Sequence, residues 1–233
     1  MTESQPGASK GAFADPEYAE AVVDLLGAIA YGELAAFERL ADDAKLAPGL
    51  ADKIALSSMA ASEFSHLAQL EDRISELGAD PYEAMEPFRQ ALDDFHAHTA
   101  PSDWYEGLVK AYVGDGLARD FYREIAAYLD PETRALITEA LEDSQRSAFI
   151  VEKVRAGIAA DHRLGGRLAL WGRRLMGEAL IQAQRIAAER DAMTALLAGG
   201  VDRPGLDLAA IGRMFTRLTE RHSERMDELG LEA

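Results

Sequence analysis

Apolar residues recur at helical spacing along most of the chain, without the alternation of apolar and polar residues that is typical of strands. The first such segment begins at Asp15-Pro16-Glu17, where a capping acid precedes proline, and reaches about Leu46 before Pro48-Gly49 interrupts it. A second covers residues 50–77 and ends at Gly78. The pattern predicts an all-α protein.

The apolar pattern weakens over residues 80–101, which contain three prolines. For this stretch we expect a long connection with a short helix near Pro81. We expect His96 and His98 within it to be exposed loop residues rather than a metal-binding pair. Further helices are predicted from Asp103 to before Asp130-Pro131, and then over residues 131–160, 166–197 and 207–229.

Two short links and one long link thus join the first four predicted helices, which is the connectivity of ferritin-like bundles. An up-and-down bundle would use three short loops. We therefore predict a ferritin-like four-helix bundle with a long crossover between helices 2 and 3, plus two C-terminal helices. In terms of domains, residues 1–14 are expected to be a disordered leader and residues 15–160 the bundle. Residues 161–233 are expected to form a helical pair packed on the bundle within the same domain.

Several acids fall on the apolar faces of these helices, where a solvent-facing carboxylate would be out of place. Glu33 continues the apolar stripe of the first helix, and Glu63 that of the second. His66 follows Glu63 by three residues, so both side chains lie on one face, as a single metal ion requires. Two long antiparallel helices joined by a short loop would bring Glu33 and Glu63 to one level.

The third and fourth helices offer a similar but incomplete set of candidate metal ligands. Asp115 lies on an apolar face of the third helix and Asp143 on that of the fourth, and Arg146 stands three residues after Asp143, where a second histidine would be expected. Arginine cannot bind a metal, because its guanidinium stays protonated and offers only donors. In the alternative interpretation the acids form a buried polar network, in which Arg146 supplies the positive charge instead of a metal. Tyr31 and Tyr112 are candidates for carrying a proton or an electron, with ordinary core tyrosines as the alternative.

Long stretches of the sequence resemble the MiaE-like proteins, ferritin-fold relatives of a non-haem di-iron tRNA hydroxylase, in what looks like an actinobacterial branch. The resemblance covers most of the chain and implies metal ligands at Glu33, Glu63, His66, Asp115 and Asp143, with a histidine at the position of Arg146. It is carried by the segments AVVDLLGAIAYGELAAFERLADDAKLAP, MAASEFSHLAQL, AMEPF, WYEGLVKAYVGDGLARDFYREIA and GGRLALWGRRLMGEAL.

The amino-acid composition limits which kinds of partner the chain is expected to bind. The chain has 24 Lys+Arg against 41 Asp+Glu, and its formal net charge of −17 argues against nucleic acid and anionic membranes as partners. No apolar run is long enough to span a bilayer. The sequence has no cysteine, and its first residues lack the apolar core of a secretion signal, so we expect a cytoplasmic location.

The sequence leaves three functions open, and with them the question of whether the protein is an enzyme. The first is a non-haem oxygenase or hydroxylase with a di-iron or single-iron cofactor and an unknown small-molecule substrate. The second is a metal-degenerate ferritin-like module, without a cofactor, that binds a ligand or partner. The third is iron storage, which needs a cage that two extra helices would obstruct. These two helices need a partner surface, either the bundle or a second subunit, so a homodimer is also open.

Overall fold

The computed structural model describes residues 15–140, 146–198 and 208–232. Throughout these ranges the regular elements are helices and no strand occurs, as the periodicity predicts. None of the described helices is both long and apolar enough to cross a bilayer. In chain order the elements are α2 (Pro16–Asp43), η1 (Ala44–Leu46), α3 (Leu50–Glu76), α4 (Pro81–His98), α5 (Trp104–Ala126), α6 (Pro131–Ala140), α7 (Arg146–Ala160), α8 (His162–Glu189), α9 (Asp191–Ala198) and α10 (Leu208–Glu228).

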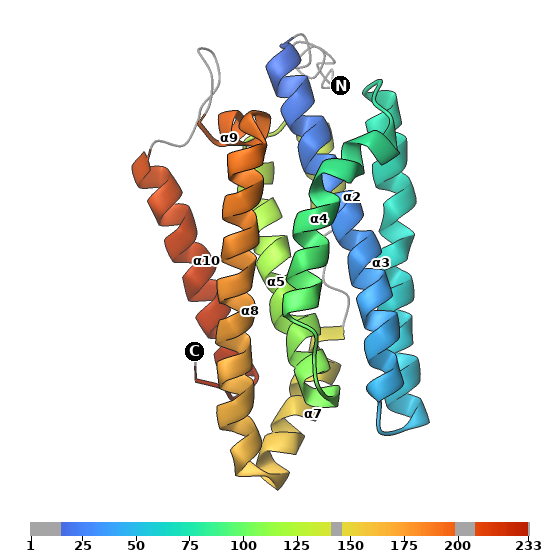
Figure 1. Cartoon of the computed structure of the whole chain (residues 1–233), viewed down its shortest axis with the longest axis vertical. Helices are drawn as coiled ribbons and strands as arrows, with labels where there is room; N and C mark the ends of the chain where they lie inside the picture. Colours follow the sequence, from blue (N-terminus) through green and yellow to red (C-terminus); the bar gives the residue numbers. More distant parts are fainter. Residues whose placement is uncertain (1–14, 141–145, 199–207, 233) are drawn as a thin grey trace, which may run out of the picture.

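Helices α2 and α3 form an antiparallel pair, joined by the short η1 turn (Figure 1). The carboxylate of Asp15 caps α2 by accepting a hydrogen bond from Glu17 N, and Pro16 fits the first turn because its missing N–H would have no helical partner. The Tyr18 hydroxyl donates to the carboxylate of Asp130 and accepts from its backbone N–H. The start of α2 is thereby fixed to the link between α5 and α6.

The crossover between α3 and α5 differs from the prediction, because most of it is one helix of 18 residues, α4. Pro87 lies inside α4, where it removes one helical hydrogen bond. The helix is stabilised instead by an apolar face against α2, which includes the fully buried Phe88. At this contact a Cβ atom on Gly27 would lie 2.1 Å from the backbone oxygen of Ala84, so only glycine allows so close an approach. His96 and His98 both lie on the last turn of α4, so the expectation of loop residues was wrong for both; His98 is exposed as expected, whereas His96 is half-buried.

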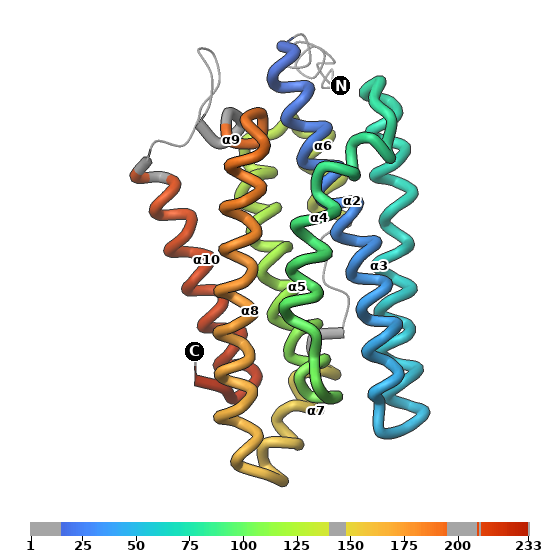
Figure 2. The backbone as a smooth tube through the Cα atoms, in the orientation of Figure 1, coloured from blue at the N-terminus to red at the C-terminus, as the bar shows by residue number. Residues whose placement is uncertain are grey.

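The C-terminal part also differs in its boundaries. The predicted fourth helix corresponds to α6 and α7, and residues 141–145 between them lie outside the described part. The predicted fifth helix starts earlier, at His162, because Asp161 caps it, and it ends at Glu189 rather than reaching 197. Arg190 leaves the helical conformation there and pairs with Asp24 of α2 through two guanidinium nitrogens. Helices α5, α8 and α10 lie side by side (Figure 2).

Two large apolar clusters form most of the core, and a small third one is built around Met214 and Leu218 of α10. One large cluster contains the N-terminal half of α2, the C-terminal half of α3, and residues of α4, α5, α6 and α9. The other contains the C-terminal end of α2, the N-terminal half of α3, and residues of α5, α7, α8 and α10. Charged side chains at the middle of α2, α3 and α5 lie between the two large clusters, and we call these residues the polar layer: the buried Glu33, Glu63 and Arg119, and the partly exposed Asp115.

Candidate metal site and cavity

Three of the predicted ligands converge in the polar layer. Glu33 of α2 and Glu63 and His66 of α3 each offer one ligand atom, and these atoms all lie within 4.8 Å of one another. Glu33 and Glu63 are buried, with 8% and 3% of their surface exposed, and His66 is half-buried. One turn of α3 separates Glu63 from His66, so the spacing acts here as the sequence analysis predicted.

The hydrogen bonding of Glu33 is incomplete. Its Oε2 atom is buried and makes no hydrogen bond to any described residue, and it lies 3.5 Å from Nδ1 of His66. A buried carboxylate oxygen without a hydrogen bond is costly unless a proton, a cation or a metal ion compensates it. Two carboxylates and an imidazole are suitable donors for a transition metal such as iron or zinc. The three residues therefore fit one ion.

Arg119 of α5 is a member of the polar layer that the sequence analysis missed. Its Nη2 atom lies 2.9 Å from Oδ2 of Asp115 and 3.7 Å from Oε1 of Glu63, and its Nε donates to Oδ1 of Asp115 at 3.0 Å. Only 7% of the residue is exposed. The apolar stripe on which Asp115 was identified continues through position 119, so this stripe was the signal that could have revealed it. Arg119 gives the layer a positive charge beside two of its acids.

The other predicted metal ligands, Asp115 and Asp143, are not part of this group of three. The Asp115 side chain is 37% exposed and is linked to Glu63 through Arg119. Asp143 and the side chain of Arg146 lie outside the described residues, although α7 begins at position 146. Metal binding at the Asp115–Asp143 side, and the role of Arg146, stay predictions.

The two candidate tyrosines point to other helices. Tyr31 donates a hydrogen bond of 2.8 Å to Asp93 of α4, and burial together with this carboxylate raises its pKa. Tyr112 donates to Glu228 of α10. A third tyrosine, Tyr122 of α5, lies near the triad, the name we use for Glu33, Glu63 and His66: its hydroxyl would lie 3.5 Å from a Cβ atom on Gly32, next to Glu33. Burial and the negative charge of Glu33 raise the Tyr122 pKa, so this phenol keeps its proton and can donate a hydrogen bond on the Glu33 side.

A cavity of about 600 Å³ adjoins the triad. Glu33, Glu63, Arg119 and Tyr122 line it at the polar layer, and it extends between α2, α4 and α5. Arginines of α10 contribute a further wall and are held by acids of α5: Arg225 pairs with the buried Asp120. Such a cavity has the size of a small-molecule site.

Residues 16–200 match a family model described as a ferritin-like domain of actinomycetes. The chain belongs to this ferritin-like family. Its all-α bundle confirms the predicted fold class. The matched part of the ferritin-like domain contains the triad and Arg119, whereas α10 follows it. No curated protein matches the chain.

Proposed function

We propose that this ferritin-like protein is an oxidoreductase of the hydroxylase type, which holds iron at Glu33, Glu63 and His66 and acts on a small molecule in the adjoining cavity. The observation that carries the proposal is the convergence of two buried carboxylates and an imidazole within 4.8 Å, next to that cavity. The resemblance to MiaE-like hydroxylases supports the reaction type. The net charge of −17 favours a small molecule over tRNA as substrate.

The chain's own residues would have distinct roles around such a site. Iron held by these ligands would supply the redox chemistry for activating oxygen. Tyr122 keeps its proton near Glu33 and can donate a hydrogen bond to a substrate or to the carboxylate. Arg119 holds Asp115 and limits the negative charge around Glu63. The apolar part of the cavity wall, including Ile29 and Met59, would exclude water from a bound substrate.

A second candidate function is a binding module without metal. It is favoured by Arg119, because this buried cation already compensates Asp115 and approaches Glu63 without any metal. Arg146 would add a further positive charge if its side chain enters the layer, as proposed from the sequence.

Anaerobic titration of the metal-free chain with Fe(II), followed by metal analysis after gel filtration, separates the two candidates. We expect about one iron per chain, because the described residues provide one complete donor set. Glu63→Gln and His66→Ala should each abolish tight binding. Glu76→Gln, an exposed position on α3, is the matched control and should bind like wild type. A wild-type chain that retains no iron would refute the proposal and leave the binding module.

A further inference from the structure

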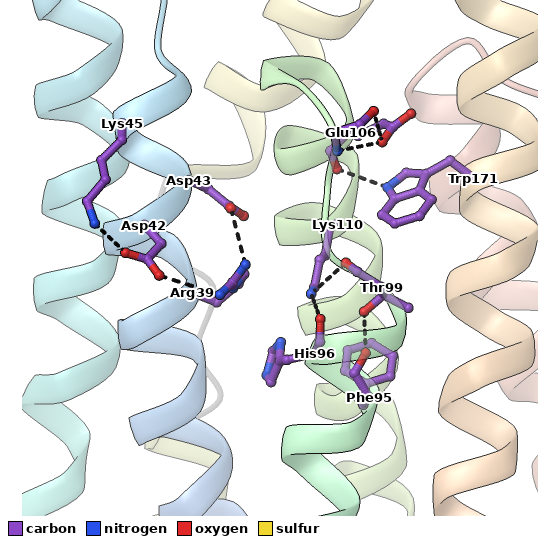
Figure 3. Close-up of polar contacts among 11 residues, drawn as sticks. Arg39, Asp42, Asp43, Lys45, Phe95, His96, Thr99, Glu106, Lys110 and Trp171 are labelled. Carbon is purple, nitrogen blue, oxygen red and sulfur yellow. Dashed lines mark hydrogen bonds and ion pairs between the residues drawn. The ribbon is translucent and has the colours of Figure 1, made fainter.

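The cavity that begins at the triad has a second polar end, formed by charged and polar side chains from three helices. Arg39 and Asp43 extend from α2, His96 comes from the last turn of α4, and Lys110 comes from α5 (Figure 3). All four line the cavity. None of them was singled out as a functional residue by the sequence analysis. We call this group the Arg39 cluster.

The guanidinium of Arg39 has unused hydrogen-bonding capacity. Its ion pairs with Asp42 and Asp43 measure 3.5 and 3.9 Å, longer than the roughly 2.7–2.9 Å of a charge-assisted hydrogen bond. Its Nε atom is buried and has no hydrogen-bond partner among the described residues. A guanidinium presents its donors as a planar fork that matches a carboxylate. Arg39 is therefore placed to receive an anionic group from the cavity.

The hydrogen bonding of the other residues in the Arg39 cluster is also incomplete. Lys110 is 3% exposed and donates to the backbone oxygens of Thr99, at 2.8 Å, and His96, at 3.4 Å, which uses two of its three N–H donors. Asp43 is also 3% exposed, and among the described residues its one polar contact is the long ion pair with Arg39. The buried Nδ1 of His96 likewise has no partner among them. Buried polar atoms are normally hydrogen-bonded, so this group points to a ligand.

The electrostatics indicate the sign of the ligand's charge. Burial, followed by the positive charge of Arg39, lowers the pKa of Lys110 to about 7. Burial also raises the pKa of Asp43 to about 6, so this carboxylate is mostly ionised near neutral pH, but it is one acid beside two basic groups and can offset only one positive charge. One additional negative charge between Arg39 and Lys110 would be stabilised by both. A planar monoanion with two acceptor oxygens fits best.

Between its two polar ends the cavity also has apolar side chains in its wall. Those of α2, α3 and α4 are Ile29, Ala36, Leu40, Met59 and Leu92, and of these Ala36 lies between Glu33 and Arg39 on α2. Arg39 follows Glu33 by six residues on α2, which corresponds to about 9 Å along the helix axis. This separation is close to the length of an extended octanoate.

We propose that the cavity binds a monocarboxylic acid with an apolar chain, with its carboxylate at Arg39 and Lys110 and its chain directed toward Glu33 and Glu63. As a substrate class this inference rests on the proposed metal site. The binding itself needs no metal. The apolar end of the ligand would then lie at the triad, and the carboxylate would determine which carbon is presented there.

The test is calorimetric titration of the full-length, metal-free chain with octanoate, and with octan-1-ol as the neutral analogue. We expect octanoate to bind at about one per chain and Arg39→Gln to weaken it about tenfold or more, because a hydrogen-bonded charge is lost. Octanol binding should be the same in both proteins. Arg89→Gln, at an exposed position on α4, is the matched control and should leave octanoate binding unchanged.

A variant that binds octanoate more tightly provides a second test, because a poorly folded protein would not gain affinity. Asp43→Asn removes the carboxylate that competes for Arg39 and should tighten octanoate binding several-fold. Equal affinity for octanoate and octanol, or octanoate binding that neither Arg39→Gln nor Asp43→Asn changes, would overturn the proposal. Octanoate binding by a chain that takes up no iron would support the carboxylate site and refute the metal function, so the two failures are distinguishable.

Discussion

Arg119 determines how much negative charge the polar layer carries. Its guanidinium is almost completely buried and contacts both Asp115 and Glu63. Removing one partner from a buried ion pair leaves the other charge uncompensated, which is more costly than losing an exposed pair. We therefore expect Arg119 to stabilise the metal-free protein and to compete with any metal ion that binds Glu63.

Arg119→Met tests this competition. The variant without metal should be less stable than wild type by about 3 kcal/mol, because Glu63 and Asp115 lose their cation. It should also bind Fe(II) more tightly. Urea unfolding with and without Fe(II) measures both effects. Arg123→Met, an exposed arginine on the same helix, is the control, and equal stability of the Arg119→Met and Arg123→Met proteins would contradict the account.

Asp43 gives a pH-dependent prediction. Burial raises its folded-state pKa from 3.8 to about 6, so the folded chain binds this proton more tightly than the unfolded chain does. The contribution of Asp43 to stability is therefore lost as the pH rises through the window between about 4 and 6. Asp43→Asn should stabilise the protein by about 2–3 kcal/mol near pH 7.5 and have little effect near pH 4.

Urea midpoints across this pH range measure the effect. Asp42→Asn is the matched control, because Asp42 is more than half exposed and its hydrogen bond with Lys45 lowers its pKa. Asp42→Asn should not stabilise the protein near neutral pH. A stability difference between wild type and Asp43→Asn that stays constant with pH would show that Asp43 titrates normally.

The sequence identified the acids better than the cations of the site. Glu33 and Glu63 could be predicted because an acid on an apolar stripe is conspicuous, and His66 because it shares a face with Glu63. Arg119 follows Asp115 by four residues, a spacing that usually indicates an exposed helix pair. The apolar stripe of α5 could have indicated its burial, but its contact with Glu63 of α3 is not visible in the spacing of one helix.

At the scale of elements, α4 shows how tertiary packing can override a local signal. Pro87 and the two prolines at either end of the stretch suggested a connection. The loss of one hydrogen bond is offset by burial of an apolar face, whose members are Ala84, Met85, Phe88 and Ala91. These positions follow helical spacing, but small alanines make the stripe weak. The helices with larger apolar residues, α2, α3 and α5, could be predicted to within a few residues.

Alanine substitutions at two glycines should have opposite effects, because one glycine lies at the contact between α2 and α4 and the other faces open space on α8. Gly27→Ala should destabilise the protein by about 1–3 kcal/mol, because its methyl group would collide with the backbone of Ala84 and force the helices apart. Gly177→Ala in α8 meets nothing within 4 Å and should stabilise by about 0.5–1 kcal/mol through helix propensity alone. Thermal melts of both variants compare the two. Similar stabilisation by both would mean that α4 is not packed as closely as described.

At the scale of the whole molecule, the chain has an excess of acidic residues, and many of its basic residues are paired with acids. Arginines of α8, α10 and the α8–α9 link form ion pairs with acids of other helices, as in Arg217–Glu124 and Arg190–Asp24. These arginines are thereby engaged in holding the helices together. An extended basic surface for a phosphate backbone is not expected in such an arrangement.

We accordingly predict that the protein does not retain tRNA at physiological salt, because its net charge of −17 repels the phosphates. Filter binding with bulk tRNA over a range of salt concentrations measures this. A salt-resistant complex that is lost on substitution of a defined set of arginines would contradict the prediction and favour a tRNA substrate.

The division of the core into two large apolar clusters has a consequence for how this protein can change over evolutionary time. Each cluster buries its own side chains, and the charged residues between them contribute mainly to the chemistry of the middle of the bundle. Substitutions in that layer can gain or lose a ligand without disturbing the apolar packing at either end, provided that the buried charges stay balanced. The fold thereby separates the residues that can acquire a new reactivity, as long as their charges remain paired, from the apolar side chains that hold the two ends together.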